Sequence, residues 1–329
     1  MLYFNMEPIV WGHSRYEIIT LCPMKYHFGY VTKPRLKVTT PIQALGTFLH
    51  RRKELLYKGE PGQLKLYHKS AEAFASAAKG WWKRTVARTN KIKGQKILWE
   101  FKGQPWDFSK DGGLIEELCI KTYNKCASEE PPLYVEYSRK FMLNGRSFNV
   151  RIDEIRRNYT IREYKTGMSL PRLLQLKHFP QFTFYALAFC CFAHWDEEFA
   201  RICGVSEEDR KSWGGNPDYI SEKINLEYYN VKREIMLPVT HRSNQDYYEL
   251  DNTLSTLESI INDPYLNVYP HWGRHCNFCQ YQIPCDERSS KREFQGIPLQ
   301  PQLRLFDIIQ TPKFHDPTLK LFTKGKEVA

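Results

Sequence analysis

The stretches RSFNVRIDEIR, residues 146–156, and YTIREYK, residues 159–165, determine the architecture expected for this chain. Both runs are rich in β-branched and aromatic residues, and the Arg-Asn pair between them is a turn signal, so they predict a β-hairpin. Asp153 lies on the first run and Glu163 on the second, which allows one face of the sheet to hold both carboxylates. Because side chains alternate along a strand, Lys165 should face the same way as Glu163.

Paired acids with an adjacent lysine suit metal-assisted phosphodiester hydrolysis. Carboxylate oxygens hold Mg²⁺ or Mn²⁺, which generates hydroxide and neutralises phosphate charge, and a nearby ammonium can orient the attacking water. The next segment, Pro171 to Trp195, predicts a helix on which Gln181 and Tyr185 share one face because they are four positions apart. The alternative is a surface hairpin with a solvated Glu/Lys pair, beside a helix whose Gln and Tyr only pack.

This ordered set resembles the PD-(D/E)XK nuclease superfamily, and within it the RecB-type branch. The matching residues are Asp153, Glu163-Tyr164-Lys165 and Gln181-x-x-x-Tyr185. One departure is Val150, where the family often has glycine three residues before the aspartate. The resemblance implies an α/β fold with a restriction-endonuclease-like core, in which helices flank a mixed central sheet. It also implies roles: Asp153, Glu163 and the Tyr164 carbonyl hold Mg²⁺ or Mn²⁺, Lys165 positions the water, and Gln181 and Tyr185 orient the scissile strand.

A helix is also predicted from Thr40-Pro41, because threonine is a suitable cap and proline suits the first turn. This helix contains His50. In RecB-type nucleases a histidine on such an early helix is often an extra metal ligand, and an imidazole ligand would favour Mn²⁺ over Mg²⁺. The alternative is a satisfied helix histidine without a ligand role. Glu136 matches an acid often found in the family and is expected to be a secondary ligand or a substrate contact.

Cysteines near the C-terminal end form a second pattern. Cys276, Cys279 and Cys285 have x2 and x5 spacing, which indicates a soft metal centre whose fourth ligand comes from elsewhere, and Cys22 is the candidate. This set resembles the iron–sulfur subgroup of RecB-type nucleases, which includes AddB-like and CRISPR adaptation nucleases. The resemblance implies a [4Fe–4S] cluster that joins the N- and C-terminal regions around the core. A zinc site with the same thiolates is the alternative.

The chain has a formal net charge of +11 and a pI of about 9.1, which favours a polyanionic partner, nucleic acid before membrane. Trp81-Trp82-Lys83-Arg84 interleaves aromatic and basic residues, as single-stranded nucleic-acid sites do. The alternative is that the tryptophans are core and the cations solvated. The start of the chain, Met1–Trp11, lacks the features of a secretory signal, and no apolar run is long enough to span a bilayer, so a cytoplasmic protein is expected.

The expected segments are a helical N-terminal region, residues 1–130, a nuclease core, 131–265, a cluster segment, 266–290, and an extended tail, 291–329. Within them the pattern predicts helices at 14–30, over most of 67–127 and at 244–262, a polar loop at 196–218 and a strand-like run at 224–238. The tail contains Gln302-Leu303-Arg304-Leu305-Phe306, which resembles the peptide that docks repair proteins on the bacterial sliding clamp. A terminal strand that packs on its own domain is the alternative.

Together these features predict a metal-dependent deoxyribonuclease, a single-strand-specific exonuclease acting in DNA recombination, repair or phage DNA processing. The alternatives within the fold are a catalytically inactive DNA-binding or scaffold subunit and a CRISPR spacer-processing nuclease. A zinc-ribbon-like nucleic-acid adaptor is the alternative outside it. The sequence leaves an oligomer open.

Overall fold

The computed structural model describes residues 9–31, 37–39, 41–91, 95–97, 100–101, 104–105, 108–167, 170–214 and 221–262, with Cys276, Cys279, Tyr281 and Cys285. The chain divides into two units, Met1–Cys285 and Asp286–Ala329. The second unit lies outside the described residues, and with it the motif at Gln302, Leu303, Leu305 and Phe306. The four expected segments stay a prediction.

The longest strand, β9 (Arg146–Arg156), is the centre of a six-stranded mixed sheet. The described sheet has the order β1 (Val10–Trp11), β9, β10 (Thr160–Lys165), β11 (Asn225–Asn230) and β12 (Ile235–Val239), and β8 (Tyr134–Leu143) pairs with β9 outside this path. β9 is antiparallel to β8 and β10, whereas β1–β9 and β10–β11 are parallel pairs. The β9–β10 hairpin has the register Arg156↔Thr160 and Glu154↔Arg162, which confirms the predicted hairpin.

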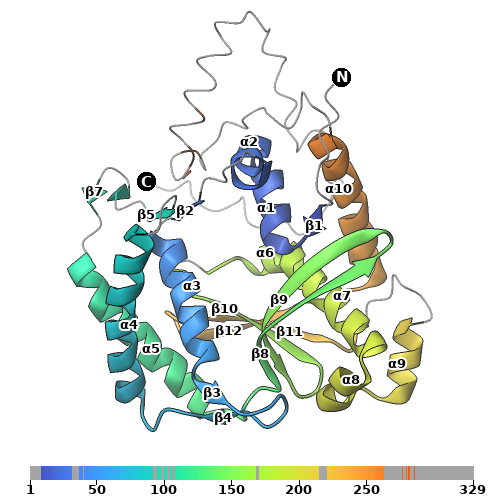
Figure 1. Ribbon diagram of the computed structural model, residues 1–329. Coiled ribbons are helices and arrows are strands. Elements are labelled where there is room, and N and C mark those ends of the chain that lie inside the picture. The colour runs from blue at the N-terminus through green and yellow to red at the C-terminus, as the bar shows by residue number, and fades with distance from the viewer. Residues whose placement is uncertain are drawn as a thin grey trace, which may run out of the picture. The chain divides into compact units, whose positions relative to one another are not determined.

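Helices cover both sides of this sheet (Figure 1). On one side lie α3 (Pro41–Glu54), α4 (Ala71–Lys91) and α5 (Phe108–Ala127), whose Phe48 and Leu118 share a core cluster with the strand residues Tyr164 and Tyr229. On the other side lie α1 (His13–Leu21), α7 (Pro180–Trp195) and α10 (Asn244–Asn262), and the α7 ring of Phe184 lies 6.2 Å from that of Phe148 on β9. The predicted α/β core with a mixed sheet between helices is therefore confirmed.

Shorter elements connect these layers. They are α2 (Pro23–Tyr26), the π-helix η1 (His27–Val31), α6 (Leu173–Lys177), α8 (Glu197–Cys203), α9 (Glu207–Gly214), β2 (Lys37–Thr39), β3 (Tyr57–Lys58), β4 (Lys65–Leu66), β5 (Gln95–Ile97), β6 (Glu100–Phe101) and β7 (Gln104–Pro105). In the part of the chain that the structure describes, no helix is both long and apolar enough to cross a membrane.

Proline explains two differences from the predicted helices. The helix expected at 14–30 is interrupted because Cys22, which precedes Pro23, is extended with φ −164° and ψ 114°. The helix expected from Pro171 to Trp195 is two helices, because Pro180 begins α7 at its first turn and the preceding residue is extended.

One further predicted segment was wrong, and another is strand as predicted but divided in two. The polar loop expected at 196–218 contains α8 and α9. Asp196 caps α8 by accepting a hydrogen bond from the Phe199 amide at 2.9 Å, and Gly204 ends it with φ +69°. The strand-like run at 224–238 is the antiparallel pair β11 and β12. The helices expected from Thr40-Pro41 and at 244–262 are confirmed as α3 and α10.

Candidate metal centre and catalytic residues

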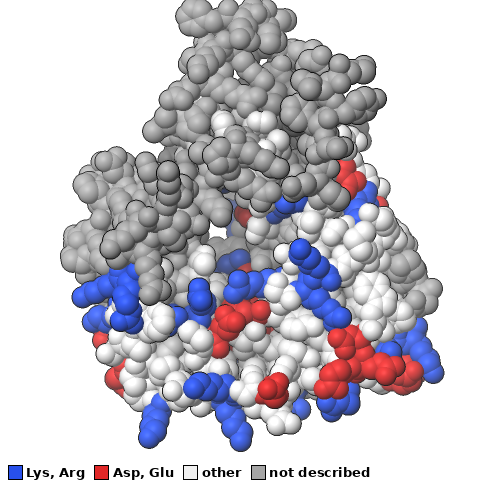
Figure 2. Space-filling model, in the orientation of Figure 1, with Lys and Arg blue, Asp and Glu red and all other residues white. Residues whose placement is uncertain are grey.

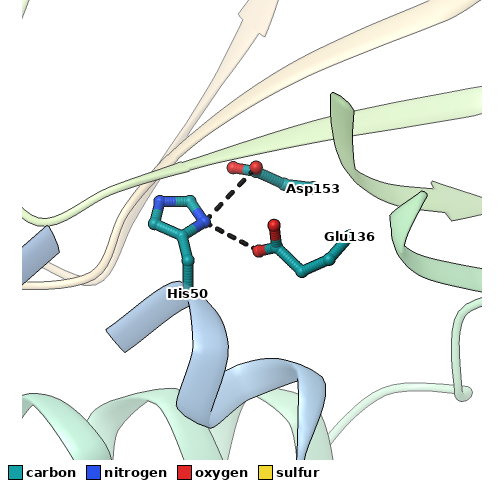
Figure 3. Close-up of side chains that lie close together, drawn as sticks. All are labelled: His50, Glu136 and Asp153. Carbon is teal, nitrogen blue, oxygen red and sulfur yellow. Dashed lines mark hydrogen bonds and ion pairs between the residues drawn. The ribbon is translucent and has the colours of Figure 1, made fainter. Parts of the chain in front are cut away.

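Three side chains from distant segments meet beside β9 (Figure 3). His50 comes from α3, Glu136 from β8 and Asp153 from β9. The His50 Nδ1 atom lies 2.8 Å from the Glu136 Oε1 atom and 3.3 Å from the Asp153 Oδ1 atom. One nitrogen and two carboxylate oxygens lie within 4.8 Å of one another, a donor set that fits Mn²⁺ or Mg²⁺.

Glu136 reaches this group through an unusual backbone conformation. Its φ of +51° is in the left-handed region, which a residue other than glycine adopts at a cost of about 1–3 kcal/mol. The left-handed residue interrupts the alternation of β8, so the rings of Tyr134 and Tyr137, three positions apart, lie 4.6 Å from each other. The register pairs Val135 with Glu154 and Tyr137 with Ile152, which places Glu136 opposite Asp153. Such strain is typical of functional sites.

Charge complementarity holds the three side chains together. Burial lowers the pKa of His50, but the charges and hydrogen bonds of Asp153 and Glu136 outweigh it and raise that pKa to about 10. Burial likewise opposes ionisation of Asp153, yet His50 and Lys53 lower its pKa overall. The imidazolium therefore sits between two carboxylates where a divalent cation would also be favoured, and metal binding would displace its proton.

A second group of polar side chains lies on β10 and α7. The Tyr185 hydroxyl donates to the Glu163 Oε2 atom at 2.6 Å, the Gln181 amide donates to the Tyr185 hydroxyl at 2.6 Å, and Lys165 donates to the Gln181 Oε1 atom at 3.2 Å. Lys165 also contacts the Glu163 carboxylate, which closes a ring of four residues. The Lys165–Glu163 contact confirms the predicted common face, and the Gln181–Tyr185 bond confirms the shared helix face.

The two groups are joined through the β9–β10 backbone. The amide of Tyr164 donates to the Asp153 Oδ2 atom at 2.8 Å, which fixes this carboxylate against the neighbouring strand. Burial lowers the pKa of Lys165, but the charges of Glu163 and Asp153 raise it overall, so this ammonium interacts electrostatically with both acids. An ionised lysine next to two carboxylates is the arrangement that the sequence predicted. The ligand roles of Glu163 and of the Tyr164 carbonyl stay a prediction.

Two cations near the metal group were missed from the sequence. Arg151, half-exposed on β9, donates to the Glu136 Oε2 atom at 2.6 Å. Lys53, three residues after His50 on α3, is fully buried: its ammonium donates to the Asp153 carbonyl at 3.2 Å and lies 3.6 Å from the centre of the Tyr164 ring. The spacing of His50 and Lys53, one turn of helix, was the available signal, because both face the sheet.

The C-terminal cysteines lie near the N-terminal one. Cys279 and Cys285 pack against an apolar cluster made by Cys22, Met24, Phe28 and Tyr281. Burial raises the pKa of Cys279, and the nearby thiols of Cys22 and Cys276 raise it further. Thiols from both ends of the unit therefore lie in the same part of the structure. The nature of any metal centre there stays a prediction.

The comparisons with known proteins agree with this architecture. A family model described as the PD-(D/E)XK nuclease superfamily matches residues 10–286, which contain the metal group, the hydrogen-bonded ring and the four cysteines. No curated protein matches the chain.

Proposed function

The chain belongs to the PD-(D/E)XK nuclease superfamily, and from that membership and the geometry of its site we propose that it is a divalent-metal-dependent nuclease that cleaves DNA. The observation that supports this proposal best is the meeting of His50, Glu136 and Asp153 beside an ionised Lys165. We propose single-stranded DNA ends as its substrate, hence an exonuclease acting in recombination, repair or phage DNA processing.

In the proposed reaction His50, Glu136 and Asp153 would hold Mg²⁺ or Mn²⁺, with Glu163 and the Tyr164 carbonyl as further donors. When bound there, such a metal would make water a better nucleophile and would neutralise charge on the scissile phosphate. The Lys165 ammonium stabilises the charge that develops on the phosphate oxygens and orients the attacking water. Gln181 and Tyr185 hold Lys165 and Glu163 in place through the hydrogen-bonded ring described above.

We also propose that Cys22, Cys276, Cys279 and Cys285 bind a [4Fe–4S] cluster that joins the two ends of the unit. The packing of Cys22 with Cys279 and Cys285 supports this, and zinc is the alternative metal. In the cluster-bound protein Cys279→Ser should lower the iron content and the brown colour, whereas a colourless wild type with stoichiometric zinc would favour the alternative. Docking on a bacterial sliding clamp through Gln302, Leu303, Leu305 and Phe306 is the corresponding proposal for the tail.

The experiment that tests the nuclease is degradation of linear single-stranded DNA labelled at either end, in the presence of Mn²⁺, by protein purified without oxygen. Asp153→Asn is the matched variant, because it keeps the size of the side chain and removes the charge. Cleavage by the wild type alone is expected, and the order of label release gives the polarity. Equal cleavage by both proteins would refute the assignment of Asp153.

The second candidate is a DNA-binding scaffold that retains the fold without catalysis. If neither the wild type nor Asp153→Asn cleaves DNA while both bind it, the scaffold is the expected function. The closed ring of Lys165, Glu163, Gln181 and Tyr185 favours the enzyme, because a scaffold needs no half-buried lysine held against a carboxylate.

A further inference from the structure

A surface on α3 and α4 concentrates guanidinium groups around one tryptophan. Trp81 is 43% exposed, and the guanidinium carbons of Arg52 and Arg84 lie 4.5 and 4.9 Å from the centre of its ring. The next residue, Trp82, is 2% exposed and packs edge-on against Phe48 of α3 at 5.1 Å. Trp82 is therefore a core residue, whereas Trp81 is exposed and packs against the guanidinium groups of Arg52 and Arg84.

Within the part of the chain that the structure describes, these cations have no acidic partner. Among the described residues no carboxylate forms an ion pair with Arg51, Arg52, Lys83 or Arg84, although ion pairs are numerous elsewhere on the chain. The Nε atom of Arg52 is buried and makes no hydrogen bond to any described residue, and Arg52 as a whole is 8% exposed. A guanidinium that is removed from water without a counter-charge is destabilising, so a bound anion would satisfy it.

This surface shares the helix α3 with the metal group. Arg52 follows His50 by two residues on α3, so the two lie about 3 Å apart along the helix axis but about 200° apart around it, on nearly opposite sides of the helix. The Phe48–Trp82 contact fixes α3 against α4, and the Arg52 guanidinium also lies over Phe48 at 5.4 Å. Figure 2 shows Lys and Arg side chains over α3 and α4 on the face that also displays acidic side chains near the centre.

We propose that Arg52, Trp81 and Arg84 form a phosphate clamp that holds the backbone of a nucleic-acid strand on the surface of α3 and α4, an inference that rests on the proposed function. Guanidinium groups offer paired N–H donors that match phosphate oxygens, and the indole ring holds them in a fixed orientation. Contact through phosphates makes the clamp independent of base sequence. The net charge of +11 attracts the same polyanion from a distance.

The test is binding of a fluorescently labelled oligothymidylate to the full chain in metal-chelating buffer, where no cleavage can occur, over a series of KCl concentrations. Arg84→Ala should bind several-fold more weakly and lower the slope of log affinity against log salt by about 0.7 for each phosphate that the variant no longer neutralises. Trp81→Leu keeps both cations, so affinity should fall while most of the slope remains. Arg201→Ala is the matched control, because Arg201 is an exposed arginine paired with Glu198 on α8.

Wild-type affinity and salt slope in both Arg84→Ala and Trp81→Leu would overturn the clamp. Displacement of the labelled strand by polyglutamate as effectively as by unlabelled DNA would overturn the assignment to phosphate. The proposed nuclease fails separately: it fails if the wild type binds the strand through this surface yet does not cleave it when Mn²⁺ is added.

Discussion

Replacement of Tyr185 by phenylalanine removes one hydroxyl from the centre of the buried ring. That hydroxyl donates to the Glu163 Oε2 atom and accepts from the Gln181 amide, both at 2.6 Å, and all three side chains are at most 7% exposed. Loss of a hydrogen bond to a charged group costs about 1.5–3 kcal/mol, and an unsatisfied buried amide adds about 1–3 kcal/mol. Because Gln181 can turn partly towards other partners, we expect the free energy of unfolding to fall by about 2–4 kcal/mol.

The same change should slow catalysis. Glu163 and Lys165 would no longer be aligned by the tyrosine hydroxyl, and a small displacement of catalytic groups lowers rates by about 10–100-fold. Single-turnover cleavage of single-stranded DNA with saturating Mn²⁺ measures this step, and urea unfolding of the same protein measures stability. Tyr248→Phe on α10 is the control, since Tyr248 is 44% exposed and should change neither quantity.

A double-mutant cycle with Gln181→Leu tests the ring directly. If the two side chains act through one hydrogen bond, the double variant should be less destabilised than the sum of the single variants by about 1 kcal/mol or more. Additive effects, or a Tyr185→Phe protein with wild-type unfolding and cleavage, would show that the ring does not hold Glu163 and Lys165 in place.

Three further predictions concern charge and buried contacts. Because the pKa of His50 is raised to about 10, metal binding near neutral pH releases its proton, so Mn²⁺ affinity should rise about tenfold per pH unit by calorimetry, and His50→Gln should flatten this dependence. Burial raises the pKa of Glu129, but hydrogen bonds from Arg162 and Lys125 lower it overall, so its stabilisation is present above the ordinary value of 4.5 and is lost as the pH falls below it. Urea unfolding should therefore show Glu129→Gln destabilised at pH 7, with the difference from wild type shrinking in acid. Arg242 is 2% exposed and donates to backbone carbonyls on both sides of the α6–α7 junction, so Arg242→Met should lower the free energy of unfolding by about 3 kcal/mol or more, measured the same way.

Local sequence patterns were sufficient to predict the β9–β10 hairpin and the contact between Gln181 and Tyr185. The β9–β10 register follows from a short turn between alternating runs, and the Gln181–Tyr185 contact follows from helical spacing alone. The roles of neighbouring tryptophans were not decided by local pattern, because both sides of α4 look alike until α3 packs against Trp82 and leaves Trp81 outside. The interruption at Cys22 follows from Pro23, because the residue before a proline disfavours the helical conformation.

The residues of the metal group were all expected from the sequence, but the backbone conformation that brings Glu136 into the group was not. On a regular strand its side chain would alternate away from those of its neighbours, and sequence gives no warning that a glutamate adopts φ +51°. The conformation persists because the surroundings determine it: His50 holds one carboxylate oxygen, Arg151 holds the other, and the Tyr134 and Tyr137 rings pack together on the residues around it. Glu136→Gly should therefore lower metal affinity even though it relieves backbone strain, because the carboxylate rather than the conformation binds the cation. Glu136→Gln should retain the packing and lose affinity to a similar extent.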